Sequence, residues 1–343
     1  MRINRLAKRR WMTPPRARDV RGVVTAGLLA CGLLGCMPRS LLITPVRDPR
    51  SLVERVVERE SIWAGDKIAL IDIDGVLSNV AERPLIGEAG DNPLAVFVDK
   101  LNRAARDSQV RGVVLRINSP GGGVTASDLM YGELRRFKEK CGKPVVACML
   151  DVAASGGYYI ACAADRIFAH PTTVTGSIGV IMITPDVSGT MAKLGIRANV
   201  IKSGPLKDAG SPLRSMTAED RAVFQRMIDR MYTRFVEVVA ESRPGLDEEA
   251  VRKLADGRVY LGPEAKDLGL VDEVGTLRDA IEAAKAAANL GDKPIVVVEY
   301  ARSYEYKPNV YAQAPQVSLL NIDLPRWLDG ASPRFMYLWA PAW

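Results

Sequence analysis

The sequence predicts an α/β fold for the region that begins near residue 66. Short apolar segments with strand character alternate with longer segments of helical periodicity, which is the pattern of a sheet covered by helices. Two expected strands lead through glycine-rich turns, near residues 119–123 and 155–157, into the next helix. The length of 343 residues allows one large domain or two modest ones.

The first half of this region contains two strands and two helices. The helix over 93–106 is expected because Leu94, Phe97 and Leu101 recur at helical spacing and share one face. The apolar runs on either side of it have the length and composition of buried strands. The four elements are a strand over 67–74, a helix over 93–106, a strand over 113–117 and a helix over 127–140.

The second half begins with another buried strand and ends with a long helix. Thr217 and Asp220 form a capping-box pattern, which predicts a helix from there to about Glu241. An apolar stripe on that helix is expected to face the core or another subunit: Val223, Met227, Met231 and Phe235. The preceding elements are a strand over 144–150, a helix that opens at Ser155, and a strand over 197–201.

The positive charge is confined to the N-terminus. The formal net charge is +7, and residues 1–35 account for all of it, with eight Lys and Arg against one acid, Asp19. The remaining residues, 36–343, are therefore neutral overall. This distribution is typical of a targeting leader, and it does not predict a nucleic-acid partner.

The leader resembles a bacterial lipoprotein signal. An apolar, glycine-rich stretch over 22–35 follows the basic residues, and the run LLGC at 33–36 resembles a lipobox, in which Cys36 is acylated and becomes the mature N-terminus. The run LLAC, which ends at Cys31, is a second candidate with a shorter apolar stretch. An ordinary cleaved signal or an uncleaved anchor is the alternative.

Four segments follow from these patterns. Residues 1–35 are expected to be the signal peptide, 36–65 a tether, 66–290 the α/β domain, and 291–343 a C-terminal extension. Within the tether, the charged run over 54–60 is compatible with a short helix. The apolar, aromatic tail over 315–343 is expected to cover a partner subunit or lipid.

The cysteines of the α/β domain do not predict a metal site. Cys141, Cys148 and Cys162 cannot all pair within one chain, and their spacing fits no metal-binding motif. Cys148 and Cys162 lie in apolar runs, so we expect them to be small buried side chains. We predict no metal and no other cofactor.

Ser155 and Lys207 are the candidate reactive pair. The sequence contains a single histidine, His170, so a serine nucleophile has a more plausible base in a lysine. A lysine can take the proton of a serine hydroxyl only if burial lowers the pKa of its ammonium group. The alternative role of Ser155 is that of a helix N-cap.

The glycines around the candidate pair can present backbone N–H groups to an anion. The run SPGGG at 119–123 follows a strand and precedes a helix, and Gly156 directly follows Ser155. Amides in such places can stabilise an oxyanion, although a tight turn alone would also explain the first run.

These residues resemble one family. Residues 67–275 are similar to the signal peptide peptidase A type of Ser-Lys peptidase, which belongs to the Clp protease/crotonase structural group. The ending PRFMYLW at 333–339 is also similar to the C-terminus of that family. The matching blocks are RINSPGGG at 116–123, ASGGYY at 154–159, TGSIGV at 175–180, KSGPLKD at 202–208, and DGRVY at 256–260 with GLVD at 269–272.

The resemblance implies roles for individual residues. It makes Ser155 the nucleophile, Lys207 the general base and Ser177 the hydroxyl that orients the lysine. It forms the oxyanion hole from the backbone N–H groups of Gly156, Gly121 and Gly122. Asp208 is expected to fix its loop. His170 stands where the family usually has no histidine and is expected to be incidental.

The resemblance also implies a fold, an assembly and a location. The fold would be the repeated β-β-α core of the Clp protease/crotonase group with a helical extension, assembled into a homo-oligomeric ring. The enzyme would hydrolyse peptides, among them signal peptide remnants. A lipid anchor or an N-terminal segment would hold it at the membrane with the catalytic domain on the periplasmic side.

Three other functions fit part of the sequence. A crotonase-like acyl-CoA enzyme would use the same glycine loops, but the secretory leader argues against it. A catalytically inactive scaffold would not require the serine and the lysine. Asp72 and Asp74 lie in a strand that fits the pattern of haloacid dehalogenase-type phosphatases, but a phosphatase leaves Ser155 and Lys207 unexplained.

Overall fold

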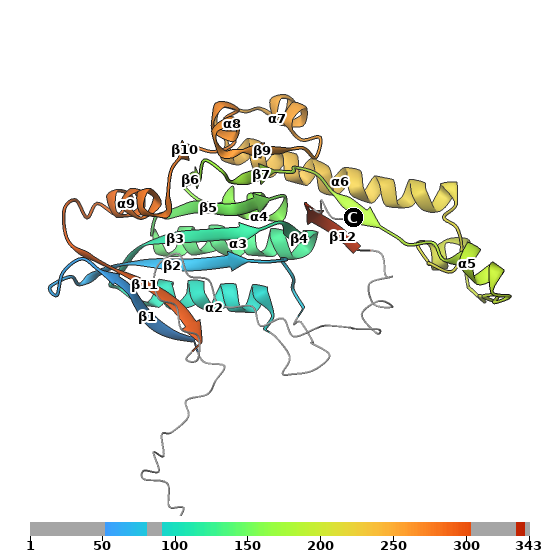
Figure 1. Cartoon of the computed structure of the whole chain (residues 1–343), viewed down its shortest axis with the longest axis horizontal. Helices are drawn as coiled ribbons and strands as arrows, with labels where there is room; N and C mark the ends of the chain where they lie inside the picture. The colour runs from blue at the N-terminus through green and yellow to red at the C-terminus, as the bar shows by residue number, and fades with distance from the viewer. Residues whose placement is uncertain (1–51, 81–90, 303–333, 340–343) are drawn as a thin grey trace, which may run out of the picture. The chain divides into compact units, whose positions relative to one another are not determined.

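A mixed β-sheet forms the centre of the protein (Figure 1). The computed structural model describes residues 52–80, 91–302 and 334–339. Within these residues, a nine-stranded sheet has the order β1-β11-β2-β3-β5-β6-β10, and β7 joins it by pairing with β5 and β9. β2, β3, β5 and β6 are parallel neighbours, as in sheets whose crossover connections contain helices. The predicted α/β fold is confirmed.

The strands of the large sheet are β1 (Leu52–Arg59), β2 (Asp66–Asp74), β3 (Val110–Ser119), β5 (Val145–Ala154), β6 (Arg166–Ala169), β7 (Val174–Gly176), β9 (Val259–Leu261), β10 (Glu273–Val274) and β11 (Ile295–Arg302). A second, three-stranded sheet contains β4 (Gly121–Gly123), β12 (Arg334–Leu338) and β8 (Ile181–Ile183) in that order.

The helices are α2 (Pro93–Arg106), α3 (Val124–Cys141), α4 (Gly156–Ala161), α5 (Ser188–Lys193), α6 (Ala218–Ser242), α7 (Glu248–Leu254), α8 (Gly262–Asp267) and α9 (Leu277–Ala287), with a short 3-10 helix, η1 (Pro205–Asp208). The capping box expected at Thr217 and Asp220 is present, and both hydrogen bonds of the motif are formed.

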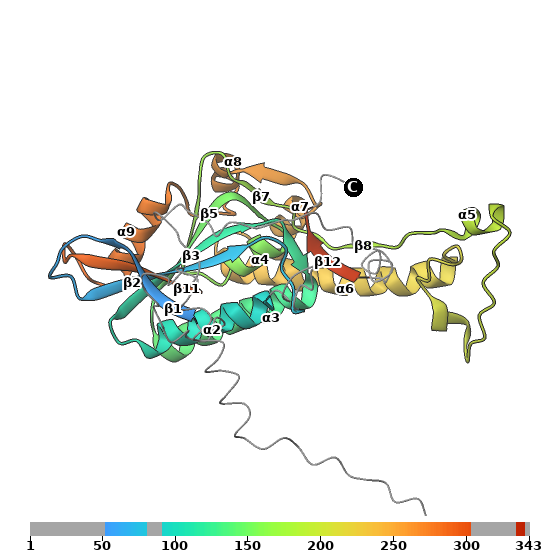
Figure 2. The ribbon, with the colours of Figure 1, turned by 60° about the horizontal axis from the view of Figure 1, so that its bottom comes forward.

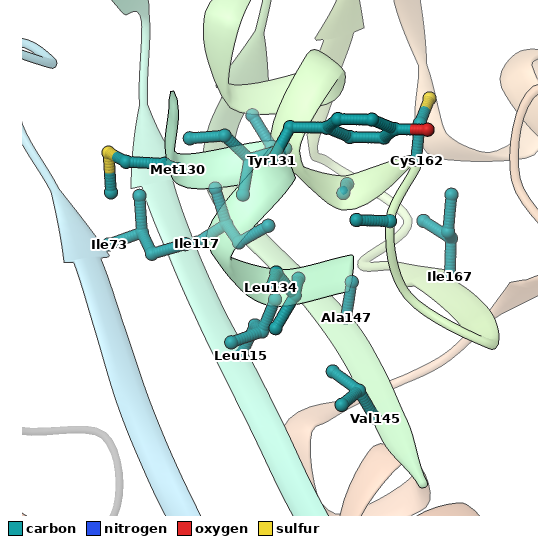
Figure 3. Close-up of a cluster of buried hydrophobic side chains, with 14 of the residues drawn as sticks. Ile73, Leu115, Ile117, Met130, Tyr131, Leu134, Val145, Ala147, Cys162 and Ile167 are labelled. Carbon is teal, nitrogen blue, oxygen red and sulfur yellow. The ribbon is translucent and has the colours of Figure 1, made fainter. Parts of the chain in front are cut away.

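Helices cover both faces of the large sheet, because successive strand residues point to opposite sides. On β2, Ile68 and Leu70 pack with the buried residues of α9, whereas Ala69 and Ile71 belong to the larger core that includes α2, α3 and α4. Figure 3 shows part of the larger core, where Leu115 and Ile117 of β3 lie among residues of α3 and β5. This packing fixes the carboxyl ends of β3 and β5, from which the candidate site is built.

Helix α6 extends well beyond the sheet. Its C-terminal half has a buried face, with Phe235 and Val239 fully shielded, whereas Met227 in its first half is 39% exposed. Figures 1 and 2 both place α5 and the start of α6 at the end of an arm that lies away from α4. Only part of the predicted apolar stripe therefore faces the core of its own chain.

Two expectations of local structure were wrong. Residues 54–60 do not form a helix, because β1 pairs with β11 in antiparallel register, from Leu52 opposite Arg302 to Arg59 opposite Val296. Its partner lies more than 200 residues away in the sequence, so no local pattern could reveal it. Residues 197–201 form no strand, and their side chains are exposed. The sheet thus extends past both predicted limits of the domain, 66 and 290.

An ion pair joins the end of α6 to the loop before β10. Arg243 donates to both carboxylate oxygens of Asp272, over 3.0 and 2.8 Å, and to the Gly269 carbonyl over 2.8 Å. Burial raises the pKa of the Asp272 carboxyl, but hydrogen bonds from Arg243 and the Ile167 N–H outweigh burial and hold that pKa below its ordinary value.

We predict that Asp272→Asn lowers the free energy of unfolding by about 2 kcal/mol at pH 7, less than for a fully buried pair because the carboxylate is partly exposed. Since the folded pKa is the lower one, the pair stabilises the fold above the unfolded carboxyl pKa of about 3.9 and loses this effect as the pH falls through the folded value. Thermal unfolding at pH 7 and pH 3 should show the difference between wild type and variant narrowing in acid. Exposed Asp267→Asn is the control, and an equal effect of both substitutions would contradict the assignment.

Candidate active site

Ser155 occupies the turn between β5 and α4 in a strained backbone conformation. Its φ and ψ are 51° and −114°, and its side chain is 1% exposed. A positive φ at a non-glycine residue costs on the order of 1–3 kcal/mol and persists only where surrounding contacts impose it. One such contact is the hydrogen bond from the Ser155 N–H to the Gly176 carbonyl, at 2.7 Å.

Ser177 lies beside Ser155 through the pairing of β5 and β7. Ala154 is opposite Gly176 in this parallel pair, so the two serines follow paired residues. Ser177 also has a positive φ, 49°, and its N–H donates to the Arg258 carbonyl at 2.7 Å. Within the described residues, neither serine hydroxyl has a hydrogen-bond partner. Both hydroxyl groups are therefore available for new hydrogen bonds. This suits a nucleophile and a second hydroxyl that orients the general base.

The glycine strand β4 approaches the Ser155 turn so closely that side chains are excluded. A Cβ on Gly121, whose φ is +99°, would overlap the Tyr337 carbonyl oxygen and lie 2.7 Å from the Gly156 nitrogen. A Cβ on Gly122 would overlap the backbone of Leu77. The absence of side chains at these positions therefore lets backbone amides and carbonyls meet at one point next to Ser155.

The predicted oxyanion-hole amides differ in their present contacts. The Gly121 N–H donates to the Ser119 hydroxyl at 3.1 Å. The Gly156 N–H, at the first position of α4, has no acceptor among the described residues. The Gly156 N–H can thus donate a hydrogen bond to an oxyanion without losing an existing bond.

Lys207 lies apart from these groups. It belongs to η1, its side chain is exposed, and no hydrogen bond of the described residues joins it to Ser155 or Ser177. Its segment is part of the arm that carries α5 (Figures 1 and 2). The structure therefore brings together both serines and the glycines, whereas the predicted base is not near them within one chain.

The loop around Lys207 is held by ion pairs. The carboxylate of Asp208 accepts hydrogen bonds from Lys202 at 2.7 Å and from Arg214 at 2.8 Å, and these contacts lower the pKa of Asp208. Arg214 in turn contacts Asp220 at the start of α6. Asp208 thus ties residues of its loop together through ion pairs, and the side chain of Lys207 is exposed.

The remaining candidates have structural roles. The ring of His170 is exposed and hydrogen-bonds to Thr172, two residues along the chain. Burial raises the pKa of Cys148 to about 12 and of Cys162 to about 11, so neither thiol ionises readily at neutral pH.

The phosphatase pattern at Asp72 is explained by a buried ion pair. The Asp72 carboxylate accepts from Nε of Arg116 at 2.6 Å, and the Arg116 side chain is completely buried. Among the residues that the structure describes, no group of three or more His, Cys, Asp and Glu side chains could hold a metal ion. The Asp72 carboxylate therefore serves to neutralise the buried guanidinium group of Arg116.

Sequence reasoning missed the C-terminal strand. β12 lies between β4 and β8, and it places the buried Tyr337 next to Gly122. The alternation of Phe335, Tyr337 and Trp339 is a strand signal that could have indicated it. The predicted aromatic tail thus contacts its own chain here, while its residues 315–333 and 340–343 lie outside the described residues.

A buried serine on a strained strand–helix turn, with the free N–H of Gly156 beside it, indicates a serine hydrolase built on an α/β sheet. Comparisons with known proteins give the family. The sequence model of peptidase family S49 matches residues 137–291, and that of Clp protease matches residues 71–183. The chain belongs to peptidase family S49 and is a serine peptidase.

Three relatives illustrate the match. The Enterococcus faecium protein "Putative signal peptide peptidase SppA" is 40% identical over 234 residues, which are 68% of this chain and 67% of that protein. "Protease 4" of Salmonella typhi is 36% identical over 66% of this chain, and "Serine protease SPPA, chloroplastic" of Arabidopsis thaliana is 34% identical over 71% of it. The matched regions are 35% and 36% of those two longer proteins.

A ClpP1 mutant of Listeria monocytogenes is a structural neighbour, with 20% sequence identity and a TM-score of 0.40, over 62% of this chain and 94% of that one. The predicted family and the predicted peptidase activity are confirmed.

We predict that Gly121→Ala lowers kcat/KM for peptide hydrolysis by at least about 100-fold, because the new methyl group would occupy the point where oxyanion donors act. Gly132→Ala is the matched control, since a Cβ there has no atom within 4 Å. In the interior of α3 this second change should stabilise the fold by about 0.5–1 kcal/mol. Wild-type activity in folded Gly121→Ala would contradict the site.

Proposed function

We propose that the protein is a serine endopeptidase in which Ser155 of one copy is activated by Lys207 of a second copy. The observation that carries this proposal is the separation of the two groups: Ser155 is buried at the sheet, whereas Lys207 is exposed on the arm. Ser177, which is adjacent to Ser155, would orient the incoming ammonium group. The ring-forming assembly expected from the sequence would place two copies side by side, as this shared site requires.

The surface of the arm supports the proposal that the arm contacts a second copy. Large apolar side chains are exposed there, including Leu194 at 70% and Ile201, which is fully exposed. Exposed apolar groups gathered on one segment mark an interface. The others between β8 and α6 are Ile196, Val200, Leu206 and Leu213.

Association of two copies would also give Lys207 the dry surroundings that a lysine needs to act as a base. An ammonium group in water stays protonated near neutral pH, and desolvation favours its neutral form. Docking of the arm onto another copy would remove water from Lys207. The neutral amine could then take the proton of the Ser155 hydroxyl.

The reaction follows from these groups. The Ser155 oxygen attacks the carbonyl carbon of the peptide bond, and the Gly156 N–H stabilises the negative charge on the carbonyl oxygen. The protonated lysine gives its proton to the departing amine, which leaves an acyl-enzyme. Water then attacks the ester, Lys207 takes its proton, and the carboxylic acid is released as Ser155 regains its hydrogen.

We predict that Ser155→Ala and Lys207→Ala each abolish peptide hydrolysis, and that co-assembled subunits of the two variants recover activity. Random mixing gives about one quarter of interfaces an intact serine facing an intact lysine, so about a quarter of wild-type activity should return. The measurement is hydrolysis after co-expression, with labelling of Ser155 by a serine-directed probe. Each variant alone is the control, and no recovery in mixed oligomers would show that the dyad is not shared.

We also propose that the enzyme is held at the membrane by an acylated Cys36, with its catalytic domain on the periplasmic side. The basic leader and the LLGC run support this proposal, and both lie outside the described residues. Among the residues described by the structure, none of the helices has the length and apolar character needed to span a bilayer. Substrates near the membrane would include signal peptide remnants.

We predict that Cys36→Ser moves the protein from the membrane fraction to the soluble fraction, because the acyl chains that anchor it are no longer attached. Cys31→Ser is the control and should leave the distribution unchanged. Mass spectrometry of the wild-type N-terminal peptide should show a start at Cys36 with added acyl mass. An unmodified peptide that continues through both cysteines would rule out lipidation.

A further inference from the structure

One arginine on the arm joins two carboxylates that belong to different elements. Nη2 of Arg214 donates to Oδ1 of Asp208 in η1, over 2.8 Å. Both terminal nitrogens of Arg214 also donate to the two oxygens of Asp220 at the start of α6, over 2.5 and 3.2 Å. The planar guanidinium group therefore links η1 to α6 through charge-assisted hydrogen bonds, which are stronger than neutral ones.

Asp220 is the fixed end of this link. Its side chain is 1% exposed, and it shares a capping box with Thr217, in which the two hydrogen bonds are 3.0 and 3.1 Å long. Asp220 lies in the first turn of α6, whose last turns contain the fully buried Val238 and Val239. Because an α-helix is hydrogen-bonded along its whole length, the packing of α6 in the core sets the place of Asp220.

Asp208 is the end of the link that lies next to the proposed base. It directly follows Lys207, and both residues belong to η1. Oδ1 of Asp208 also accepts from Lys202 at 2.7 Å, and Lys202 donates to the Pro205 carbonyl at 2.9 Å. These contacts of Lys202 stay within one loop, whereas those of Arg214 extend to another element.

The chain around Arg214 is itself held to the other side of the arm. The Ser215 hydroxyl donates to Asp186 at 2.7 Å, and the Val187 N–H donates to the Pro212 carbonyl at 2.9 Å. These bonds tie the segment that leaves β8 to the segment that returns to α6. The backbone of Arg214 is therefore already restricted, and less conformational entropy is lost when its side chain contacts both carboxylates.

From this network we infer that Arg214 is a positioning residue for the reaction: it holds η1 against α6 and thereby sets where Lys207 is presented. The inference rests on the proposed function, in which Lys207 is the general base, and it adds the residue that controls the place of that base. The ammonium group of Lys207 makes no hydrogen bond within the described residues, so the backbone that carries it determines its reach.

The reaction makes a strict demand on this position, because proton transfer requires two heavy atoms to come within hydrogen-bond distance. A displacement of about 1 Å at a reacting group can lower a rate by about 100-fold. Lysine in place of Arg214 would keep the charge, but its single ammonium group lacks the planar fork that contacts both carboxylates. Arg214→Lys should therefore restore only part of the activity that Arg214→Gln loses.

The first test measures peptide hydrolysis by full-length Arg214→Gln. We expect kcat to fall by about 10- to 100-fold, with KM within about two-fold of the wild-type value, because the base is displaced and the substrate contacts are not. Arg136→Gln is the matched control, since Arg136 is an exposed arginine of α3 that pairs with Glu133. A wild-type kcat in Arg214→Gln, or a loss that appears only in KM, would overturn the inference.

Light scattering and thermal unfolding separate positioning from stability. If Arg214 positions the base, Arg214→Gln should keep the wild-type mass, and its Tm should change by no more than about 2 °C, because the arm lies away from the core. If the subunits separate, or if Tm falls together with activity, Arg214 holds the interface or the fold, and the inference is wrong.

A double-mutant cycle tests the route through Asp208. If Arg214 acts on Lys207 through this carboxylate, Arg214→Gln should lower kcat by less than about three-fold in a protein that already carries Asp208→Ala. Lys202→Met is the reference and should cost less than Arg214→Gln, because Lys202 contacts the same oxygen without reaching α6. Independent effects of Arg214→Gln and Asp208→Ala, or equal losses for Lys202→Met and Arg214→Gln, would contradict the inference.

The reactive pair shows whether a failure concerns this inference or the proposed function. If Lys207→Ala keeps wild-type activity, or if Ser155 is not labelled by a serine-directed probe, the proposed function itself fails. If Lys207→Ala is inactive and Arg214→Gln keeps the wild-type kcat, the proposed function stands and Arg214 does not position the base.

Discussion

The backbone turn at Ser155 is the constraint on which the rest of the site depends. An L-residue avoids a φ of 51°, so the turn exists only because β5, β7 and β4 hold it from three sides. β7 accepts the Ser155 N–H, and the glycines of β4 leave room for the first amide of α4. The strain removes the hydroxyl from the usual N-cap role and leaves it without a partner among the described residues, which is the state that a nucleophile needs.

Helix α6 joins parts of the protein that would otherwise be independent. Its start adjoins the arm that carries Lys207, its middle supplies the Met231 carbonyl and Phe235 around Tyr337, and its end is followed by Arg243, which is paired with Asp272. One helix therefore connects the arm with the aromatic packing around Tyr337 and with the core of the sheet.

The sequence allowed the fold class, most helices of the core and the position of Ser155 on a strand–helix turn to be predicted, because periodicity and glycine spacing are local properties. It could not show that Lys207 lies apart from Ser155, since a sequence motif does not give the distance between two residues in the folded chain. It also could not reveal β1 or β12, because each pairs with a segment far away in the sequence. The phosphatase pattern at Asp72 could be set aside from the sequence, but the role of this carboxylate could not be predicted, because its partner Arg116 lies on the neighbouring strand.

The covalent attachment of β12 has a consequence for how the fold responds to dilution. A strand that belongs to the same chain is present near its partner strands at an effective concentration on the order of millimolar, however dilute the protein is. Its pairing with β4 and β8 therefore persists at any protein concentration. A separate peptide held by the same backbone hydrogen bonds would instead dissociate on dilution.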